Sequence, residues 1–494
     1  MRRTLPIFYS ALLLTAVNLL LRFVSTSFQV HISSVLGAEG VGLLQLVLSV
    51  GGLATTVGMA GIRTATMYLT AEELGQNRPQ RIRGVLRGCF LYSILFSSCV
   101  SLTVWFGAPL IADGWIGNLQ TVGALRLYAL FLPLVCLTGC MTGYFTAANR
   151  IGTLAAIEIA EQMCYMAVTM MMLRLWAGGN AEKACEAVVL GAGISSLLTL
   201  LCLTALHHRD RLPRTGPTPM AARLSKTALP LALADNLKVG INTTENLMVP
   251  KRLALHKGES SPLASFGTVT GMVFPVLMFP AAILFGLAEL LIPELARCNA
   301  AGSRMRIRYL VRRGVRVALL YGCLSGGILY LTAMDLCTRL YGSDTAGHYL
   351  MLYSLLAPML YCDAITDAMI KGLGQQTASV RYNILTSAMD VAFLFVLLPK
   401  YGMKGYLFSF FVTHLINFLL SIRRLMRISG VHLPIYKAFF TLSATAAAAL
   451  LAAKLSSPAG KVLVFLPAVV SLWVLCGVIG MGDLRWIKGL LRKK

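Results

Sequence analysis

Residues 11–69 read ALLLTAVNLLLRFVSTSFQVHISSVLGAEGVGLLQLVLSVGGLATTVGMAGIRTATMYL. Two long apolar runs make up this stretch, and the turn-forming segment GAEG at residues 37–40 separates them. A membrane-spanning helix needs about 20 predominantly apolar residues. Each run meets that length, so the stretch predicts two consecutive transmembrane helices joined by a tight turn.

Both predicted helices carry an arginine at membrane depth. Arg22 lies near the middle of the first helix, and Arg63 lies in the last third of the second. A cation at a helix centre costs about 2.5–3.5 kcal/mol and normally persists only where it faces a bundle interior or a water-filled cavity. Guanidinium groups bind phosphate in a bidentate manner. We therefore predict that both arginines line a hydrated cavity and contact substrate. The alternative is that each pairs with a buried carboxylate or a helix-terminal carbonyl.

The composition of the 494-residue chain indicates a membrane protein. Hydrophobic residues make up 57% of the chain and charged residues only 13%, whereas soluble domains carry about 25% charged residues. Apolar runs recur along the whole sequence and predict an all-α polytopic membrane protein with about 14 transmembrane helices. The predicted spans cover residues 6–35, 41–69, 85–106, 122–148, 153–175, 184–206, 225–250, 263–288, 310–332, 347–371, 377–398, 404–423, 435–454 and 462–481.

The net charge of +24 is distributed mainly over the short gaps between these runs. No zinc-finger or RNA-binding motif accompanies it, so we expect no nucleic-acid partner. Most of the basic residues fall on one side of the predicted spans, which places both termini in the cytoplasm of a multi-pass protein of the cell membrane. We expect these residues to contact anionic membrane lipids.

The longest polar break divides the chain into two comparable halves. Each half opens with a long helix and returns through a helix rich in glycine or proline. We predict an N-terminal six-helix lobe (1–206), a cytoplasmic linker (207–224), a C-terminal six-helix lobe (225–428), and a last part with two extra transmembrane helices and a basic cytoplasmic tail (429–494). Because six is even, the two lobes form a parallel pseudo-repeat.

The span 225–250 carries a polar stripe. Its members recur at helical spacing and share one helix face: Asp235, Lys238, Asn242, Glu245 and Asn246. Such a stripe cannot face lipid, because its polar groups would lack water or partners. We predict that Lys238, Asn242 and Glu245 bind substrate and that Asp235 contributes to coupling or gating. The alternative is an ion pair within one turn, between Asp235 and Lys238.

Three further acids lie inside predicted spans. Asp363 and Asp367 precede Lys371 at i, i+4, i+8, and Asp390 has no partner nearby in the sequence. An intramembrane acid is either paired or involved in ion or proton coupling. We regard all three acids as candidates for coupling or gating, while Asp367 and Lys371 also form a favourable i, i+4 pair.

Arginines at residues 304, 308 and 312 recur at i, i+4, i+8. This spacing predicts either an amphipathic helix lying in the interface or ordinary anchors that snorkel to the headgroups. Residues 484–494 show a similar mixture of basic and apolar residues.

Several motifs that would indicate chemistry are missing. The sequence has no P-loop, no metal-spaced histidine cluster and no nucleophile elbow. We therefore expect no ATP-driven pump, no metal, no cofactor and no enzymatic activity. The twelve cysteines form no C-x-x-C pair, which predicts neither a metal site nor a disulfide framework.

The sequence resembles the stage V sporulation protein B group of the multidrug/oligosaccharidyl-lipid/polysaccharide (MOP) exporter superfamily. The resemblance is carried by LLRFVSTSFQVHISSVLGAEGVGLLQLV at 20–47, FGTVTGMVFPVLMFPAAI at 266–283 and YLFSFFVTHLINFLLSIRRL at 406–425. It implies two six-helix lobes and translocation of an undecaprenyl-pyrophosphate-linked saccharide, with the peptidoglycan precursor lipid II as the leading substrate, by alternating access. It also implies that Arg22 and, as a looser match, Arg63 meet the pyrophosphate. Cell-wall synthesis proteins are possible partners.

Three other functional hypotheses stay open at this stage. A cation-coupled multidrug exporter of the same superfamily would have mainly acidic residues in its cavity. A membrane-embedded polyprenyl-phosphate glycosyltransferase would need an acid/base cluster in a sizeable loop, and a wall-synthesis scaffold would leave the intramembrane charges without a role.

Overall fold

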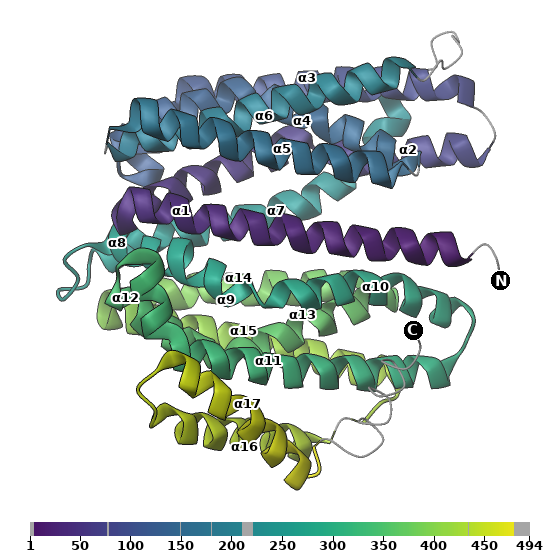
Figure 1. Ribbon diagram of the computed structural model, residues 1–494. Coiled ribbons are helices and arrows are strands. Elements are labelled where there is room, and N and C mark those ends of the chain that lie inside the picture. Colours follow the sequence, from purple (N-terminus) through teal and green to yellow (C-terminus); the bar gives the residue numbers. More distant parts are fainter. Residues whose placement is uncertain are drawn as a thin grey trace. The chain divides into compact units, whose positions relative to one another are not determined.

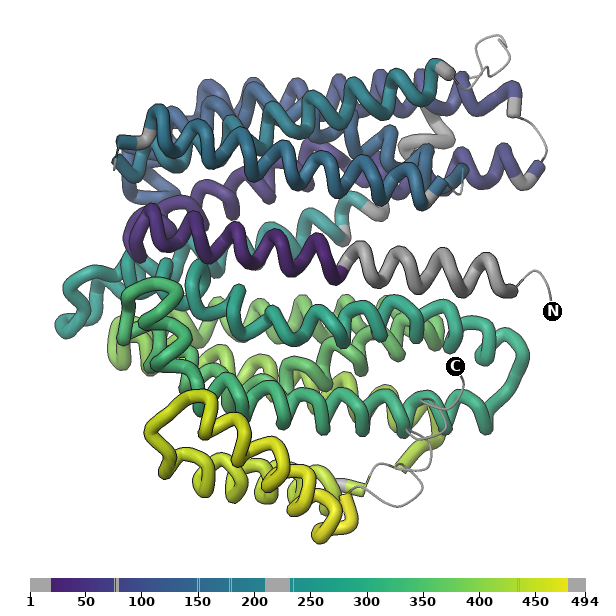
Figure 2. The backbone as a smooth tube through the Cα atoms, viewed as in Figure 1, coloured from purple at the N-terminus to yellow at the C-terminus, as the bar shows by residue number. Residues whose placement is uncertain are grey.

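The computed structural model of the protein describes residues 4–76, 79–148, 150–178, 180–209, 221–432 and 434–478 (Figures 1 and 2). All regular structure in these ranges is helical, which confirms the predicted fold class. By length and apolar composition, nine of the described helices could each span a membrane. Two bent helix pairs raise this number to eleven if each pair forms one span.

Close packing divides the chain into two compact units. The first unit comprises Met1–Gly267 and Asp390–Gly405, and the second comprises Thr268–Met389 and Tyr406–Lys494. The predicted lobes differ from these units in their bounds and remain a prediction. Residues 210–220 of the predicted linker and 479–494 of the predicted tail lie outside the described residues.

The first unit is a bundle of long helices with a few short helical turns. Its main helices are α1 (Thr4–Met59), α2 (Ile62–Gly75), α3 (Pro79–Leu110), α4 (Val122–Ala147), α5 (Ile151–Met172), α6 (Ala181–Arg209), α7 (Ala221–Leu253) and α8 (Pro262–Gly267). The C-terminal half of α14 (Gln376–Tyr401) also belongs to this unit.

The first two predicted spans are confirmed in part. Helix α1 is interrupted at Gly37, whose φ of 70° and ψ of 177° are not helical. The second span is not one helix, because Ala60 and Gly61 have φ values of 42° and 72° and separate α1 from α2. Arg63 therefore lies in the first turn of a new helix.

The second unit contains two spans that bend at a short break. Its main helices are α9 (Phe274–Met278), α10 (Ala281–Ala300), α11 (Arg304–Tyr341), α12 (Asp344–Ser354), α13 (Ala357–Gly372), the first half of α14, α15 (Met403–Ser429), α16 (Ile435–Ala453) and α17 (Pro458–Leu475). The helices around Pro280 bend by 63°, and α12 and α13 bend by 57° just before Pro358. Proline lacks an amide hydrogen and clashes with the preceding turn, which explains both positions.

Small residues bring helices into close contact in both units. A Cβ atom on Gly143 of α4 would lie 2.5 Å from the carbonyl oxygen of Arg63 on α2. A Cβ atom on Gly322 of α11 would lie 2.7 Å from the Cα atom of Pro358, and one on Gly326 would lie 2.8 Å from the oxygen of Ser354. The sequence motifs Gly139-x-x-x-Gly143 and Gly322-x-x-x-Gly326 thus serve packing within the chain.

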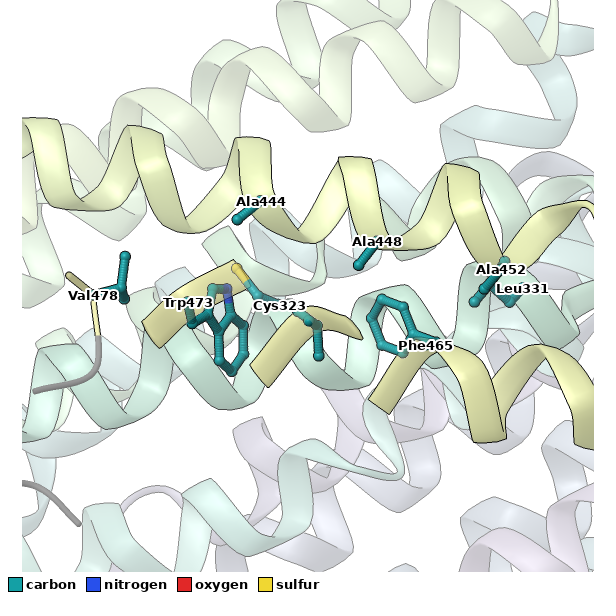
Figure 3. Packing of buried hydrophobic residues seen from close by; sticks show 9 residues of the cluster. Cys323, Leu331, Ala444, Ala448, Ala452, Phe465, Trp473 and Val478 are labelled. Atoms are coloured by element: carbon teal, nitrogen blue, oxygen red, sulfur yellow. The ribbon is translucent and has the colours of Figure 1, made fainter. Parts of the chain in front are cut away.

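Helices α16 and α17 form the last part of the second unit and pack against α11. Figure 3 shows the apolar contact, with Phe465 and Trp473 of α17 on the side of α16 that carries Ala444 and Ala448. The Trp473 indole Nε1 donates to the Thr441 carbonyl at 3.3 Å. Large rings against small alanines give the interdigitated packing expected of a helix pair in lipid.

Candidate functional site

The polar stripe lies on α7, which runs as one continuous helix through all five of its members. The three members nearest the N-terminal end of the helix are exposed: Asp235, Lys238 and Asn242. The other two, Glu245 and Asn246, are half-buried. Among the contacts of the described residues, no ion pair joins Asp235 to Lys238. The stripe is therefore divided into an exposed part and a packed part.

The packed part of the stripe is held by α1. The Asn246 amide donates to Ser49 Oγ at 3.0 Å, and the Thr243 hydroxyl donates to the Ser49 carbonyl at 3.2 Å. Nothing in the sequence around Ser49 predicted this role, because a serine inside an apolar run is ordinary in a membrane helix. The contact fixes the rotation of α7 against α1, so the exposed members keep a constant orientation.

Glu245 lies close to Asp390, and the two carboxyl groups interact electrostatically. Asp390 is only 3% exposed. Two ionised carboxylates at close range repel each other, so the pair favours a proton on one of them. The pair can therefore hold and release one proton, a state that belongs to both groups together.

Two contacts join the C-terminal end of α7 to the part of α14 that carries Asp390. The Arg252 guanidinium lies 3.4 Å from the centroid of the Phe395 ring, a cation–π contact. His256 Nδ1 lies 3.2 Å from the Pro399 carbonyl oxygen. These contacts hold α14 beside α7 and thereby keep Asp390 opposite Glu245.

Arg22 is exposed on the first half of α1. The buried face of this half is marked by Phe28 and Ile32, and the Phe28 ring packs edge-to-face on Tyr165 of α5 at 5.3 Å. Six residues separate Arg22 from Phe28, so at 100° per residue the two side chains point about 120° apart around the helix. Arg22 therefore lies to one side of the helix face that packs within the first unit.

Arg63 is exposed at the start of α2. It interacts electrostatically with Glu158, a half-buried acid on α5. Its backbone is fixed by the close approach of Gly143 on α4. Arg63 thus has an acidic neighbour, as the alternative of a carboxylate partner predicts. Its side chain is nevertheless exposed.

The acids of α13 lie in the second unit and have partners there. Asp363 accepts a hydrogen bond from the Asn417 amide of α15 at 2.9 Å. Asp367 forms an ion pair with Lys371 at 2.6 Å and accepts a hydrogen bond from the Ser379 hydroxyl. A polar residue within an apolar run was the available signal for Asn417, which the sequence interpretation did not use.

Two acceptor atoms of the Asp363–Asn417 pair have no hydrogen-bond donor among the described residues. Asp363 Oδ1 and Asn417 Oδ1 are buried and have no hydrogen-bond partner among the described residues. A buried polar atom without a partner is costly. A proton on Asp363 would turn this carboxyl group into a donor and remove one unpaired acceptor.

Comparison with known proteins agrees with this architecture. A family model described as "Polysaccharide biosynthesis protein" matches residues 8–228. Stage V sporulation protein B of Bacillus subtilis (strain 168) is 21% identical over 411 residues, covering 80% of this chain and 78% of the relative.

Two solved structures share the fold. Lipid II flippase MurJ in an inward closed conformation superposes with a TM-score of 0.71 at 12% identity, covering 96% of this chain and 99% of that chain. An inward-facing multidrug resistance MATE family transporter of the MOP superfamily gives a TM-score of 0.68 at 13% identity, covering 84% of this chain and 99% of that chain.

The chain thus shares the fold of polytopic membrane transporters of the MOP superfamily. Its sequence is similar to stage V sporulation protein B over most of its length, which confirms the resemblance predicted from the sequence.

Proposed function

We propose that the protein is a flippase that moves an undecaprenyl-pyrophosphate-linked saccharide, lipid II, across the cell membrane with both termini in the cytoplasm. The relatives support this proposal, since one is a stage V sporulation protein B and another is a lipid II flippase. The observation that carries it is the exposure of cations on apolar helices of the first unit.

Arg22 and Lys238 are these cations, and Asn242 lies one turn from Lys238 on the same face of α7. A guanidinium binds phosphate oxygens in pairs, and an ammonium binds them as a point charge. Asn242 can donate to and accept from sugar hydroxyls. This set of side chains suits a headgroup that joins a pyrophosphate to a saccharide, while the polyprenyl tail stays in lipid.

Net transport by alternating access requires a driving force that sets its direction. The Glu245–Asp390 pair supplies a group that can take up a proton on one side and release it on the other. The pair lies on the same helix face as Lys238 and Asn242, so protonation and headgroup binding would act on one helix. Asp235 and Asp363 are the further candidates for coupling or gating, whereas Asp367 is paired with Lys371 and is assigned a structural role.

The test is lipid II translocation by purified protein in liposomes. Arg22→Ala should lower the translocation rate about 10- to 100-fold, because a charge-assisted hydrogen bond is worth about 1.5–3 kcal/mol. Lys238→Ala should also lower the translocation rate. Arg126→Ala is the matched control, because Arg126 is an exposed arginine of the first unit on α4. Full activity of Arg22→Ala would remove the proposed phosphate contact.

A cation-coupled multidrug exporter is the second candidate. It is favoured by the buried acid Asp390, by the half-buried acids Glu245 and Asp363, and by the similarity to a multidrug transporter structure. Cells that lack the protein would then become sensitive to cationic drugs while their wall synthesis stays normal. The flippase proposal predicts the reverse pattern.

A further inference from the structure

The two bent spans of the second unit lie side by side. The halves that precede the breaks touch, because the Phe274 ring of α9 packs edge-to-face on the Tyr353 ring of α12 with the centroids 5.3 Å apart. The halves that follow the breaks also touch, because a Cβ atom on Gly372 of α13 would lie only 2.9 Å from the Ile292 carbonyl oxygen of α10. Each bent span therefore contacts the other on both sides of its break.

Tyr361 on α13 joins the second break to the first. It is 1% exposed, and its hydroxyl donates to the Leu277 carbonyl of α9 at 2.5 Å. In a continuous helix this carbonyl would accept from the amide four residues later, which is that of Ala281. Among the backbone contacts of the described residues, Ala281 does not donate to Leu277. The Tyr361 hydroxyl thus replaces a backbone donor at the bend, as expected where a side chain inserts into a kinked helix.

Helix α11 supports both breaks from one short stretch. Tyr321 donates to the Pro280 carbonyl at 2.8 Å, at the first break. A Cβ atom on Gly326 would lie 2.8 Å from the Ser354 carbonyl oxygen, so α11 also lies close to the second break. The rings of Tyr321 and Tyr361 are stacked, with centroids 6.2 Å apart and planes at 28°. We call these two residues the tyrosine pair.

Straightening of the first span would break these contacts. The Leu277 carbonyl would regain its backbone donor, and the Tyr361 hydroxyl would lose its acceptor. A buried hydroxyl without a partner is costly, so Tyr361 would move, and with it the first turns of α13 that follow the second break. Packed helices shift between discrete arrangements rather than deforming continuously. The contacts therefore favour two states for the spans, both bent or both straightened.

We propose that the two breaks form one coupled hinge, in which the tyrosine pair links the bend at Pro280 to the bend before Pro358. Hinges concentrate a conformational change in a few residues at the ends of elements, and both breaks are of this kind. All residues of the hinge belong to the second unit. None of them belongs to the proposed substrate site, so this inference does not depend on the proposed function.

The experiment is hydrogen–deuterium exchange of the full-length protein in detergent, read by mass spectrometry. Exchange is measured at amides that close the breaks by donating to the carbonyl three residues earlier: Phe279 and Ala282 at the first break, Leu355 and Leu356 at the second. Exchange reports local opening of such bonds. Thermal melting of each variant verifies that the fold is kept.

The main variant is Tyr321→Phe, which removes the bond to Pro280 and leaves the ring. The matched control is Tyr341→Phe on the same helix, because its hydroxyl donates to the Met272 carbonyl at 3.1 Å, in the same bent span but before the break. Tyr321→Phe should raise exchange about 3- to 10-fold at both breaks, as expected for the loss of one hydrogen bond in a coupled unit. Tyr341→Phe should leave both breaks within about twofold of the wild type.

Faster exchange of Tyr321→Phe at the first break alone would show that the bends are independent and overturn the coupled hinge. Equal increases in Tyr321→Phe and Tyr341→Phe would mean a general loosening of the unit, and unchanged exchange in both would mean that the tyrosine pair links nothing. Either result overturns the proposal.

Pro280→Ala tests the hinge from the other direction, because it restores an amide hydrogen at the first break and changes no group of the second. A coupled hinge predicts that exchange at Leu355 and Leu356 shifts in the same direction and by a similar factor as at Phe279. A shift confined to the first span would contradict it.

Discussion

Helices α7 and α13 carry the same kind of sequence pattern, acids and a lysine at helical spacing, yet their side chains have different surroundings. On α7, Lys238 and Asn242 are exposed, and only Glu245 and Asn246 are packed. On α13, the corresponding groups have partners: Asp363 with Asn417, and Asp367 with Lys371 and Ser379.

The difference teaches that a polar face on a membrane helix has two uses. Where neighbouring helices supply complementary groups, the face joins helices together. Where they do not, the face remains available to a ligand or to water. We therefore expect changes on α7 to affect transport at nearly constant stability, and changes on α13 to affect stability more than transport.

The largest effect is expected at the Glu245–Asp390 pair. Glu245→Gln allows a hydrogen bond, because the new amide can donate to Asp390, but it removes the exchangeable proton. Transport should fall about 5- to 150-fold, the usual range of a coupling free energy, while the melting temperature stays nearly unchanged. The measurement is lipid II translocation together with proton uptake into liposomes.

Asp367→Asn is the control for that variant, since it makes the same chemical change on α13. It should leave the translocation rate within about twofold of the wild type. If Asp367→Asn abolishes transport and Glu245→Gln does not, the contrast between the two helices is reversed.

Asp363→Ala should give the next largest effect, this time on stability. It leaves the Asn417 amide without its acceptor, which costs about 1–3 kcal/mol of the free energy of unfolding. Thermal melting in detergent measures the loss.

Asp363→Asn distinguishes a structural role of Asp363 from a coupling role. The new amide can accept from Asn417 Nδ2 and donate to Asn417 Oδ1, an atom that faces no donor in the wild type. Stability should therefore be retained. Retained transport would mark Asp363 as structural, and loss of transport at full stability would mark it as a coupling site and weaken the contrast with α7.

Lys371→Met should have the smallest effect. The Lys371 side chain is 38% exposed and that of Asp367 is 24% exposed, and ion pairs near the surface contribute about 0–1 kcal/mol. Melting at low and high ionic strength should differ less for the variant than for the wild type, because salt screens the pair. A loss above about 2 kcal/mol would show that the pair is far more important than its exposure indicates.

The breaks in the helices were only partly predictable. The turn at Gly37 was predicted, because glycine tolerates a backbone conformation that ends a helix. The breaks at Pro280 and Pro358 coincide with prolines, but Pro133 lies inside the continuous helix α4, so proline alone did not locate them. The break at Ala60–Gly61 was missed, since alanine is the best helix former and its positive φ is imposed by its surroundings.

The candidate site was predictable to a similar degree. Helical spacing placed the α7 residues on one face, and the α7 helix confirms this. The partner of Glu245 was not predictable, because about 145 residues of chain separate it from Asp390 and no local pattern links them.

The sequence by itself determined the all-helical membrane class, the interruption of the first long helix at Gly37, and which residues carry charge at membrane depth. These follow from local properties, namely hydropathy, backbone preference and helical period. Only the tertiary structure decided which charges have partners, because pairing depends on side chains that distant helices bring within hydrogen-bond range. That is why Asp363 and Asp390, two similar acids in similar apolar runs, face an amide in one case and a second carboxyl group in the other.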